Sequence, residues 1–165
     1  MAAPDELVDL VDEDDVVVEV VTRAEMRARG AAARHRAVYV AVTTSAGKLV
    51  VHRRADWKDV YPGYWDLCFG GVLGAGEAWD DAARRELLEE AGVDAVPTLV
   101  GVHAWAAPDV QLNARVYRTT HDGPFTCPDG EVVEVATVPL GDLDEWLIGR
   151  NVCPDSVDLV VPHLR

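Results

Sequence analysis

The 165-residue chain has few cysteines and no long apolar run, and both shortages exclude whole classes of protein. Its three cysteines, Cys68, Cys127 and Cys153, are an odd number without a CxxC pair, so neither a disulfide framework nor a zinc knuckle is expected. No apolar run approaches the roughly 20 residues that span a bilayer. The acidic N-terminus lacks the basic start of a secretory signal. We therefore expect a soluble protein in a reducing, cytoplasmic setting, without membrane contact.

Positive charge is also scarce, because 29 Asp and Glu against 15 Lys and Arg give a formal net charge of −14. A chain this acidic is unsuited to neutralising the phosphates of duplex nucleic acid. The charge is unevenly spread: residues 1–21 hold eight acids and no Lys or Arg, whereas residues 22–58 hold nine Lys or Arg and two acids. Two interpretations stay open, and both can hold. Either the two segments neutralise one another, or part of the basic segment faces an anionic substrate.

Short β-rich runs separated by turns, together with helical segments, predict an α/β domain with a mixed sheet and helices on its faces. Thr22 followed by Glu25 is typical of the start of a short helix. Hairpins are expected from 7–11 with 16–21, from 35–44 with 48–53 and from 98–107 with 110–120, with further strands at 65–69 and 131–138 and short helices at 140–148 and after 156. No linker interrupts the chain, so residues 1–165 are predicted to form one domain, with the hairpin and helix of residues 1–30 packed on it.

Residues 78–91 form the strongest helix candidate, because they are rich in Ala, Leu, Glu and Arg and are followed by Gly92. Ala83, Leu87, Leu88 and Ala91 are expected to face a core. This helix also carries an unusual concentration of acid.

Glu86, Glu89 and Glu90 stand at positions i, i+3 and i+4, so their carboxylates project from one face of the helix. Their mutual repulsion, and their place near the negative end of the helix dipole, both oppose this arrangement. An exposed acidic face paired with nearby arginines is the ordinary explanation for such glutamates. A hard divalent cation is the functional one, because Mg²⁺ is held by a few carboxylates together with water and substrate phosphates.

The glycine-rich loop before this helix favours the functional explanation. Residues 71–93 read GVLGAGEAWDDAARRELLEEAGV and resemble the Nudix box, which has the form G-x5-E-x7-R-E-aliphatic-x-E-E-x-G-aliphatic. Its specified positions are all filled, by Gly71, Glu77, Arg85, Glu86, Leu87, Glu89, Glu90, Gly92 and Val93. A match at nine positions over 23 residues is far more specific than a lone glycine motif.

The resemblance implies the Nudix fold, an α/β/α sandwich with a loop–helix–loop motif. It implies a Mg²⁺-dependent hydrolase, with Mn²⁺ as the alternative metal, that cleaves a diphosphate bond in a nucleoside diphosphate derivative or a related small organic diphosphate. The expected metal ligands are the carbonyl of Gly70 and the carboxylates of Glu86, Glu89 and Glu90, with Glu86 and Glu90 also catalytic. Arg85 and Glu77 are expected to be structural.

The family also uses an acid from outside the box, as a metal ligand or as the base. Glu131 and Glu134 are the candidates in this chain. Glu134 is the preferred one and is predicted as a metal ligand. An exposed acid on a strand edge is the ordinary alternative for both.

The segment HRRADWKDVYPGYWD, residues 52–66, resembles the corresponding segment of isopentenyl-diphosphate isomerases and their Nudix hydrolase relatives. The matching Arg54 and Lys58 are expected to bind the substrate diphosphate, since a guanidinium fork and an ammonium group make a sensible phosphate clamp. Ordinary surface charge is the alternative role for both residues.

The isomerase residues themselves are mostly absent. Where isomerases have Cys-Gly-His, this chain has Gly70-Gly71-Val72, and Cys68 lies two residues early. One isomerase metal histidine is matched by His35, but its partner position holds Ala28. We therefore predict a hydrolase and keep two alternatives, an isomerase-like enzyme and a non-catalytic ligand-sensing module. The sequence leaves the oligomeric state open, with a homodimer as one possibility.

Overall fold

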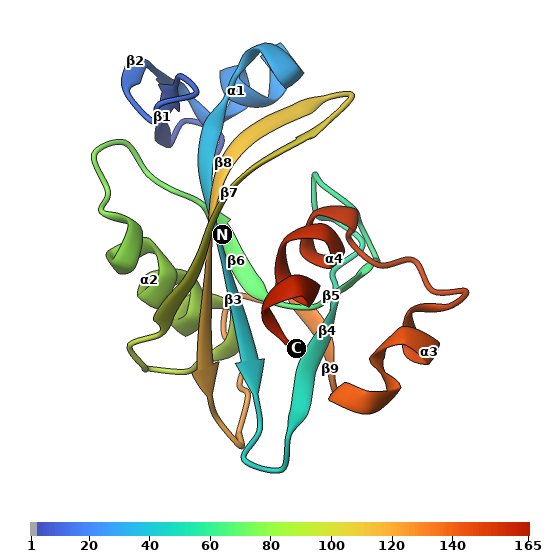
Figure 1. The fold of residues 1–165 in the computed structure, drawn as a ribbon. Coiled ribbons are helices and arrows are strands. Elements are labelled where there is room, and N and C mark those ends of the chain that lie inside the picture. The colour runs from blue at the N-terminus through green and yellow to red at the C-terminus, as the bar shows by residue number, and fades with distance from the viewer. Residues whose placement is uncertain (1–2) are drawn as a thin grey trace.

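The computed structural model describes residues 3–165 and has three layers, with strands in the middle and helices on both sides (Figure 1). The elements are β1 (Leu7–Val11), β2 (Val17–Thr22), α1 (Arg23–Arg29), β3 (His35–Thr43), β4 (Lys48–Arg54), β5 (Trp65–Asp66), β6 (Phe69–Val72), α2 (Trp79–Ala91), β7 (Thr98–Ala107), β8 (Val110–Thr120), β9 (Val132–Pro139), α3 (Leu143–Leu147) and α4 (Pro154–Val160), with short 3-10 turns at Gly30–Ala32, Leu140–Asp142 and Val161–His163. No helix among residues 3–165 is both long and apolar enough to cross a bilayer.

Strand β3 is the centre of the sheet and makes it mixed. It runs parallel to β8, from His35↔Leu112 to Thr43↔Thr120, and antiparallel to β6 on its other edge. Strand β7 pairs with β8 over its whole length in the predicted antiparallel hairpin. The predicted α/β class with a mixed sheet is confirmed.

The predicted hairpin of β3 with β4 forms only at its turn. The two strands pair at Thr43↔Leu49 and then diverge, because β3 inserts between β6 and β8 while β4 inserts between β5 and β9. The predicted strand at 65–69 is likewise divided. Its first part pairs with β4 and its last residue begins β6, so the chain crosses between the two halves of the sheet at Leu67 and Cys68.

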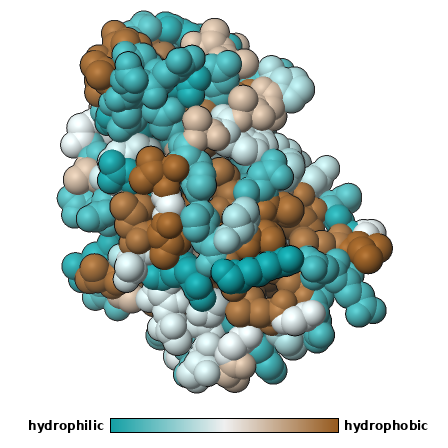
Figure 2. Space-filling model, viewed as in Figure 1, coloured by the Kyte–Doolittle hydropathy of each residue, from teal (hydrophilic) through white to brown (hydrophobic). Residues whose placement is uncertain are grey.

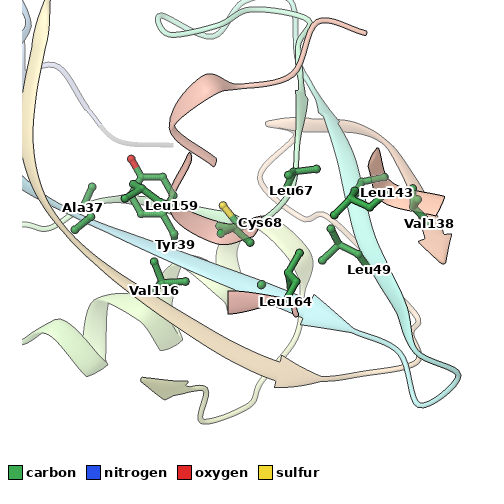
Figure 3. Close-up of a cluster of buried hydrophobic side chains, with 14 of the residues drawn as sticks. Ala37, Tyr39, Leu49, Leu67, Cys68, Val116, Val138, Leu143, Leu159 and Leu164 are labelled. Atoms are coloured by element: carbon green, nitrogen blue, oxygen red, sulfur yellow. The ribbon is translucent and has the colours of Figure 1, made fainter. Parts of the chain in front are cut away.

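Both faces of β3 are buried, which explains its nearly continuous apolar sequence. Alternate residues Val38, Val40 and Val42 belong to a core cluster under α2. The residues between them, including Tyr39, belong to a second cluster that is completed by α3, α4 and Cys68 (Figure 3). A helix layer on each face is the α/β/α sandwich that the box resemblance implied.

The N-terminal hairpin adds a small third cluster and joins the sheet through Leu10↔His35. Thr22 caps α1 as predicted, since its Oγ1 accepts a hydrogen bond of 3.1 Å from the amide of Glu25. The outer strand β2 leaves Val18 and Val20 at least half exposed, and an apolar patch lies in that region of the surface (Figure 2).

Helix α2 buries one stripe, with Ala83, Leu87 and Ala91 completely inaccessible. The expectation that Leu88 also faces the core is wrong, because its side chain is 46% exposed. Gly92 ends the helix with φ of 73°, and its amide bonds back to the carbonyls of Leu87 and Leu88. This left-handed conformation is the reason a glycine is required there.

Candidate functional site

The glutamates of α2 open onto a cleft at the edge of the apolar stripe. Glu86 is 8% exposed and Glu90 is 3% exposed, whereas the Glu89 side chain is 44% exposed. We call this hollow the acidic cleft, and its lining includes Glu86, Glu89, Glu90, Glu131, Lys58 and Arg23. Gly70 and Gly71 of β6 form part of its wall, so the structure brings the box glutamates and Gly70 together as the sequence predicted.

Arg85 joins the loop before the helix to the helix itself. Its Nε and one terminal nitrogen bond both carboxylate oxygens of Glu77, at 2.7 and 2.9 Å. Its other terminal nitrogen bonds Glu86 at 2.9 Å and Glu89 at 3.1 Å. A guanidinium group can do this because its donors form a rigid planar fork. Glu77 in turn accepts from the amide of Gly74, which closes the loop.

The N-terminal hairpin holds the same loop from the other side. The amide of Gly76 donates to Asp9 Oδ2 at 2.8 Å, and the amide of Ala75 donates to the carbonyl of Leu7 at 2.8 Å. Asp9 is only 8% exposed. Residues outside the box therefore help to position the glycine loop, and no sequence motif indicated this role.

The two glycines at the cleft wall leave room for different neighbours. A Cβ on Gly71 would lie 2.5 Å from Oε1 of Glu86, so the missing side chain provides the space for that carboxylate. A Cβ on Gly70 would lie 1.9 Å from the carbonyl oxygen of Val38, so the missing side chain there permits the close pairing of β6 with β3.

Two carboxyl groups of the cleft, those of Glu86 and Glu90, are held in an environment that resists ionisation. Burial raises the pKa of Glu86 to about 7, against the opposing effect of Arg85. Burial and the neighbouring Glu86 raise the pKa of Glu90 well above its usual range. For Glu131 the hydrogen bond and charge of Lys58 outweigh burial and lower the pKa. The neighbouring Glu90 also lowers the pKa of Glu131 through a side-chain hydrogen bond. A bound cation would relieve this crowding of negative charge.

In the described chain, residues 3–165, no three His, Cys, Asp or Glu side chains are already arranged closely enough to hold a metal ion. Arginine and lysine side chains of the protein form ion pairs with these carboxylates instead. Arg85 bonds Glu86 and Glu89, and Lys58 pairs with Glu131 at 2.9 Å. Side-chain rotation at the cleft surface would therefore have to accompany cation binding.

The preferred acid from outside the box is not part of this cleft. The Glu134 side chain is 52% exposed and pairs with Arg53 at 3.3 Å. Glu131, the other candidate, lines the cleft and is only 10% exposed in its side chain. Strand register explains the difference, since Glu134 lies opposite Arg53 within β9, whereas Glu131 directly precedes that strand.

The predicted phosphate clamp is divided between two places. Lys58 lies in the acidic cleft. Arg54 does not, because its Nε and one terminal nitrogen bond the carbonyl of Val60 and the other terminal nitrogen contacts Asp66 at 3.4 Å. Arg23, which the sequence reasoning did not single out, lines the cleft at the start of α1. Its guanidinium has no hydrogen-bond or ion-pair partner within residues 3–165.

The structure shows that the acidic and basic segments partly neutralise one another, and the interpretation that part of the basic segment faces an anionic substrate stays a prediction. Arg29 pairs with Glu19 at 2.7 Å, and Arg36 pairs with Asp15 at 2.9 Å, so the acidic and basic segments do neutralise one another. Arg23 and Lys58 instead face a hollow that is lined by the box residues. Arg23 and Lys58 are the two cations of the basic segment that line this hollow.

Comparisons with known proteins agree with this geometry. The family model of the NUDIX domain matches residues 33–155. A Pseudomonas aeruginosa protein described as "Uncharacterized Nudix hydrolase PA4841" is 39% identical over 164 residues, covering 99% of this chain and 96% of that protein. The crystal structure of DR0079 from Deinococcus radiodurans superposes with a TM-score of 0.81 at 24% identity, covering 97% of this chain and all of that one. The NUDIX domain of Shewanella oneidensis NrtR, solved in complex with ADP ribose, superposes with a TM-score of 0.62 at 18% identity over 85% of this chain and 95% of its own.

Proposed function

This chain belongs to the NUDIX family, hydrolases of diphosphate bonds, and from that premise we propose that it is a Mg²⁺-dependent enzyme acting on a nucleoside diphosphate derivative or a related organic diphosphate. The observation that carries the proposal is the acidic cleft, whose lining combines Glu86, Glu89, Glu90 and the buried Glu131 with the cationic side chains of Arg23 and Lys58. The ADP ribose bound by the Shewanella domain is itself a nucleoside diphosphate derivative, which supports the substrate class.

The donor set suits a hard divalent cation. It consists of carboxylate oxygens and the backbone of Gly70, which are the ligand types that Mg²⁺ and Mn²⁺ prefer. Glu86, Glu89 and Glu90 would hold the ion together with Gly70, and Glu131 replaces Glu134 as the proposed acid from outside the box. When bound, such an ion supplies charge neutralisation of the diphosphate and a lower pKa for a coordinated water.

The chain's own residues then handle the proton and the charge. In hydrolysis an O–P bond forms from water, the bridging P–O bond breaks, and the leaving phosphate keeps the bridging oxygen. A carboxylate oxygen of Glu86 or Glu131 accepts the proton of the attacking water as general base. Arg85 holds Glu86 from behind and Lys58 keeps Glu131 ionised, so both acceptors are oriented before substrate binds.

Arg23 and Lys58 are the proposed contacts for the non-reacting phosphate oxygens. Both border the cleft, and Arg23 is half-buried without a counter-ion within residues 3–165. Arg27 lies near enough that burial and the charge of Arg23 lower its pKa. An arriving diphosphate would relieve this repulsion between cations, which favours binding at that place.

The isomerase alternative is disfavoured by the same wall of the cleft. Allylic isomerisation needs a proton donor and a proton acceptor on opposite sides of a carbon atom. At the position of the isomerase cysteine this chain has Gly70, which has no side chain, and Val72 replaces the histidine. A non-catalytic sensing module is the second alternative, and the experiment below separates it.

The test is hydrolysis of a panel of nucleoside diphosphate derivatives and prenyl diphosphates with Mg²⁺, read as released phosphate or monophosphate. We expect turnover of at least one compound, no turnover in EDTA, and a loss of kcat of at least about 100-fold in Glu89→Gln and Glu90→Gln. Glu145→Gln, which changes an exposed glutamate of α3, is the matched control and should keep wild-type activity. Full activity in EDTA or in the box variants would refute the mechanism, and binding without turnover would favour the sensing module.

A further inference from the structure

Strand β7 is the outer strand on its side of the sheet. Within residues 3–165 it pairs with β8 alone, and its residues take part in no backbone hydrogen bond outside that ladder. The pairing with β8 is regular from Gly101 to Ala107, after a bulge between Leu99 and Gly101. The outer edge of this regular run therefore presents N–H and C=O groups that can pair with another strand.

The two faces of β7 differ in how they are covered. On one face, His103 Nε2 lies 2.7 Å from His163 Nε2 in the C-terminal turn, and the indole of Trp105 donates to Asp158 of α4 at 2.9 Å. The other face is open to solvent along the regular run, at Val102, Ala104 and Ala106. Val102 is 67% exposed. An apolar face thus borders the unpaired edge.

Strand β7 also lacks the usual protection of an outer strand. Natural outer strands are commonly guarded against pairing with other chains by charged side chains or proline. The residues of β7, TLVGVHAWAA, include no Lys, Arg, Asp, Glu or Pro, and the uncharged stretch runs from Ala95 to Pro108. The bulge is the one protective feature of β7, and it lies before the regular run. Such an edge is expected where a strand has a partner.

Charge indicates which partner fits this edge. Two copies of the chain, each with a net charge of −14, repel one another over most of their surfaces. This repulsion is smallest where neither copy brings a charged side chain, as along β7. A strongly basic or acidic partner would find no opposite charge at this edge, whereas a second copy brings an edge that is equally neutral and apolar.

The other outer strand with exposed valines, β2, is less suited to pairing with itself. Its Val18 and Val20 are 65% and 50% exposed. Glu19 lies between them at the middle of the strand, and residues 1–21 hold eight acids and no Lys or Arg. A two-fold pairing of β2 would bring these like charges of the two copies together, which is destabilising.

We propose that β7 is a dimerisation edge whose partner is the β7 strand of a second copy of this chain. The two strands run antiparallel about a two-fold axis at Ala104, so that the two sheets become one and the interface is isologous. In this register Val102 faces Ala106 of the second copy, and His103 faces Trp105. Among the described residues none of β7 lines the acidic cleft, so the proposal is independent of the proposed function.

The experiment measures the molar mass of the full chain by light scattering and sedimentation, at protein concentrations from micromolar to millimolar. We expect a reversible equilibrium between one chain of 17.9 kDa and twice that mass. Added salt should favour the dimer, because it screens the repulsion between two acidic copies. Amide hydrogen exchange in residues 101–107 should slow as the protein concentration rises, because pairing protects the outer edge.

Val102→Lys should weaken dimerisation at least about 10-fold, because it adds the charge that normally prevents pairing of outer strands. Val18→Lys is the matched control, since it makes the same change on β2 at a valine of nearly equal exposure, and it should dimerise like the wild type. Circular dichroism checks that each variant folds. If Val102→Lys does not fold, Ala104→Lys, which places two lysines opposite one another at the axis, and the exchange measurement on the wild type decide the question.

A wild-type protein that stays monomeric at every concentration would overturn the proposal. A dimer that Val102→Lys leaves unchanged, or one that only Val18→Lys disrupts, would overturn it as well. So would a dimer whose protection against exchange lies outside β7.

Discussion

Alanine substitution at the two neighbouring glycines of β6 should separate catalysis from stability. In Gly71→Ala the three atoms nearest to the new Cβ would all belong to the carboxylate of Glu86, with Oε1 at 2.5 Å and Oε2 at 3.0 Å. Ordinary contact begins near 3.4 Å, so the carboxylate must move by about 1 Å. It is the flexible end of a side chain at a cleft surface, so this movement costs little folding free energy.

We therefore expect Gly71→Ala to lower mainly the catalytic rate and Gly70→Ala to lower mainly the stability. A displacement of about 1 Å at a catalytic group costs roughly 100-fold in rate, whereas the stability of Gly71→Ala should stay within about 1 kcal/mol of wild type. In Gly70→Ala the new Cβ would lie 1.9 Å from the backbone carbonyl of Val38, which cannot rotate away. Separation of β6 from β3 should cost at least about 3 kcal/mol, or roughly 6 to 12 °C in Tm for a domain of this size.

The assay pairs kcat for the best diphosphate in the substrate panel with Tm from circular dichroism. For Gly71→Ala we expect a lower kcat with a Tm close to that of the wild type. For Gly70→Ala we expect a lower Tm. Wild-type kcat in Gly71→Ala would refute the claim that Gly71 makes space for a catalytic carboxylate. A lowered Tm in Gly71→Ala similar to that of Gly70→Ala would show that its role is structural.

Three further predictions concern the cations and acids around the site. Arg23→Ala should raise KM at least about 10-fold with a smaller effect on kcat, because a charged phosphate contact contributes about 1.5–3 kcal/mol; Arg29→Ala, on the same helix but paired with Glu19, is the control, and equal KM values would contradict the assignment. Glu131→Gln should lower kcat by at least about 10-fold while Glu134→Gln stays near wild type, and steady-state kinetics in which only Glu134→Gln is impaired would restore the original choice of acid. Burial raises the pKa of Asp155 in α4 from 3.8 to about 6, so its contribution to stability is present below pH 4 and is lost as pH rises through 6. In urea denaturation, Asp155→Asn should therefore have a free energy of unfolding about 1–3 kcal/mol higher than wild type at pH 7.5 and little different from it at pH 3.5. An increase that is the same at both pH values would exclude this cause.

The local part of the site was predictable because helix geometry is local. Residues three and four apart in a helix share a face, so Glu86, Glu89 and Glu90 had to project together once the helix formed. Gly92 after the helix and the structural role of Arg85 likewise follow from a contiguous motif of 23 residues. The alternation of apolar residues predicted the strands for the same reason, since side-chain direction repeats every two residues.

Other local expectations failed where packing competed with the sequence pattern. Leu88 is as apolar as a core residue, but it lies outside the buried stripe of α2, which contains Leu87. The pattern of β3 and β4 was compatible with an ordinary hairpin, yet each strand found other partners along its edges. Local preference decides that a strand forms, and burial of its two faces decides what it pairs with.

Only the tertiary structure could decide which distant side chains line the hollow beside the box. Glu131 and Glu134 differ by three positions, and strand register alone places one in the acidic cleft and the other against Arg53. Arg23 is separated from the box by tens of residues and belongs to no motif. Sequence by itself determined the box helix and its carboxylates, because their spacing is set by backbone geometry over a few residues. The partners of those carboxylates depend on how whole elements pack, and that packing is a property of the entire buried core.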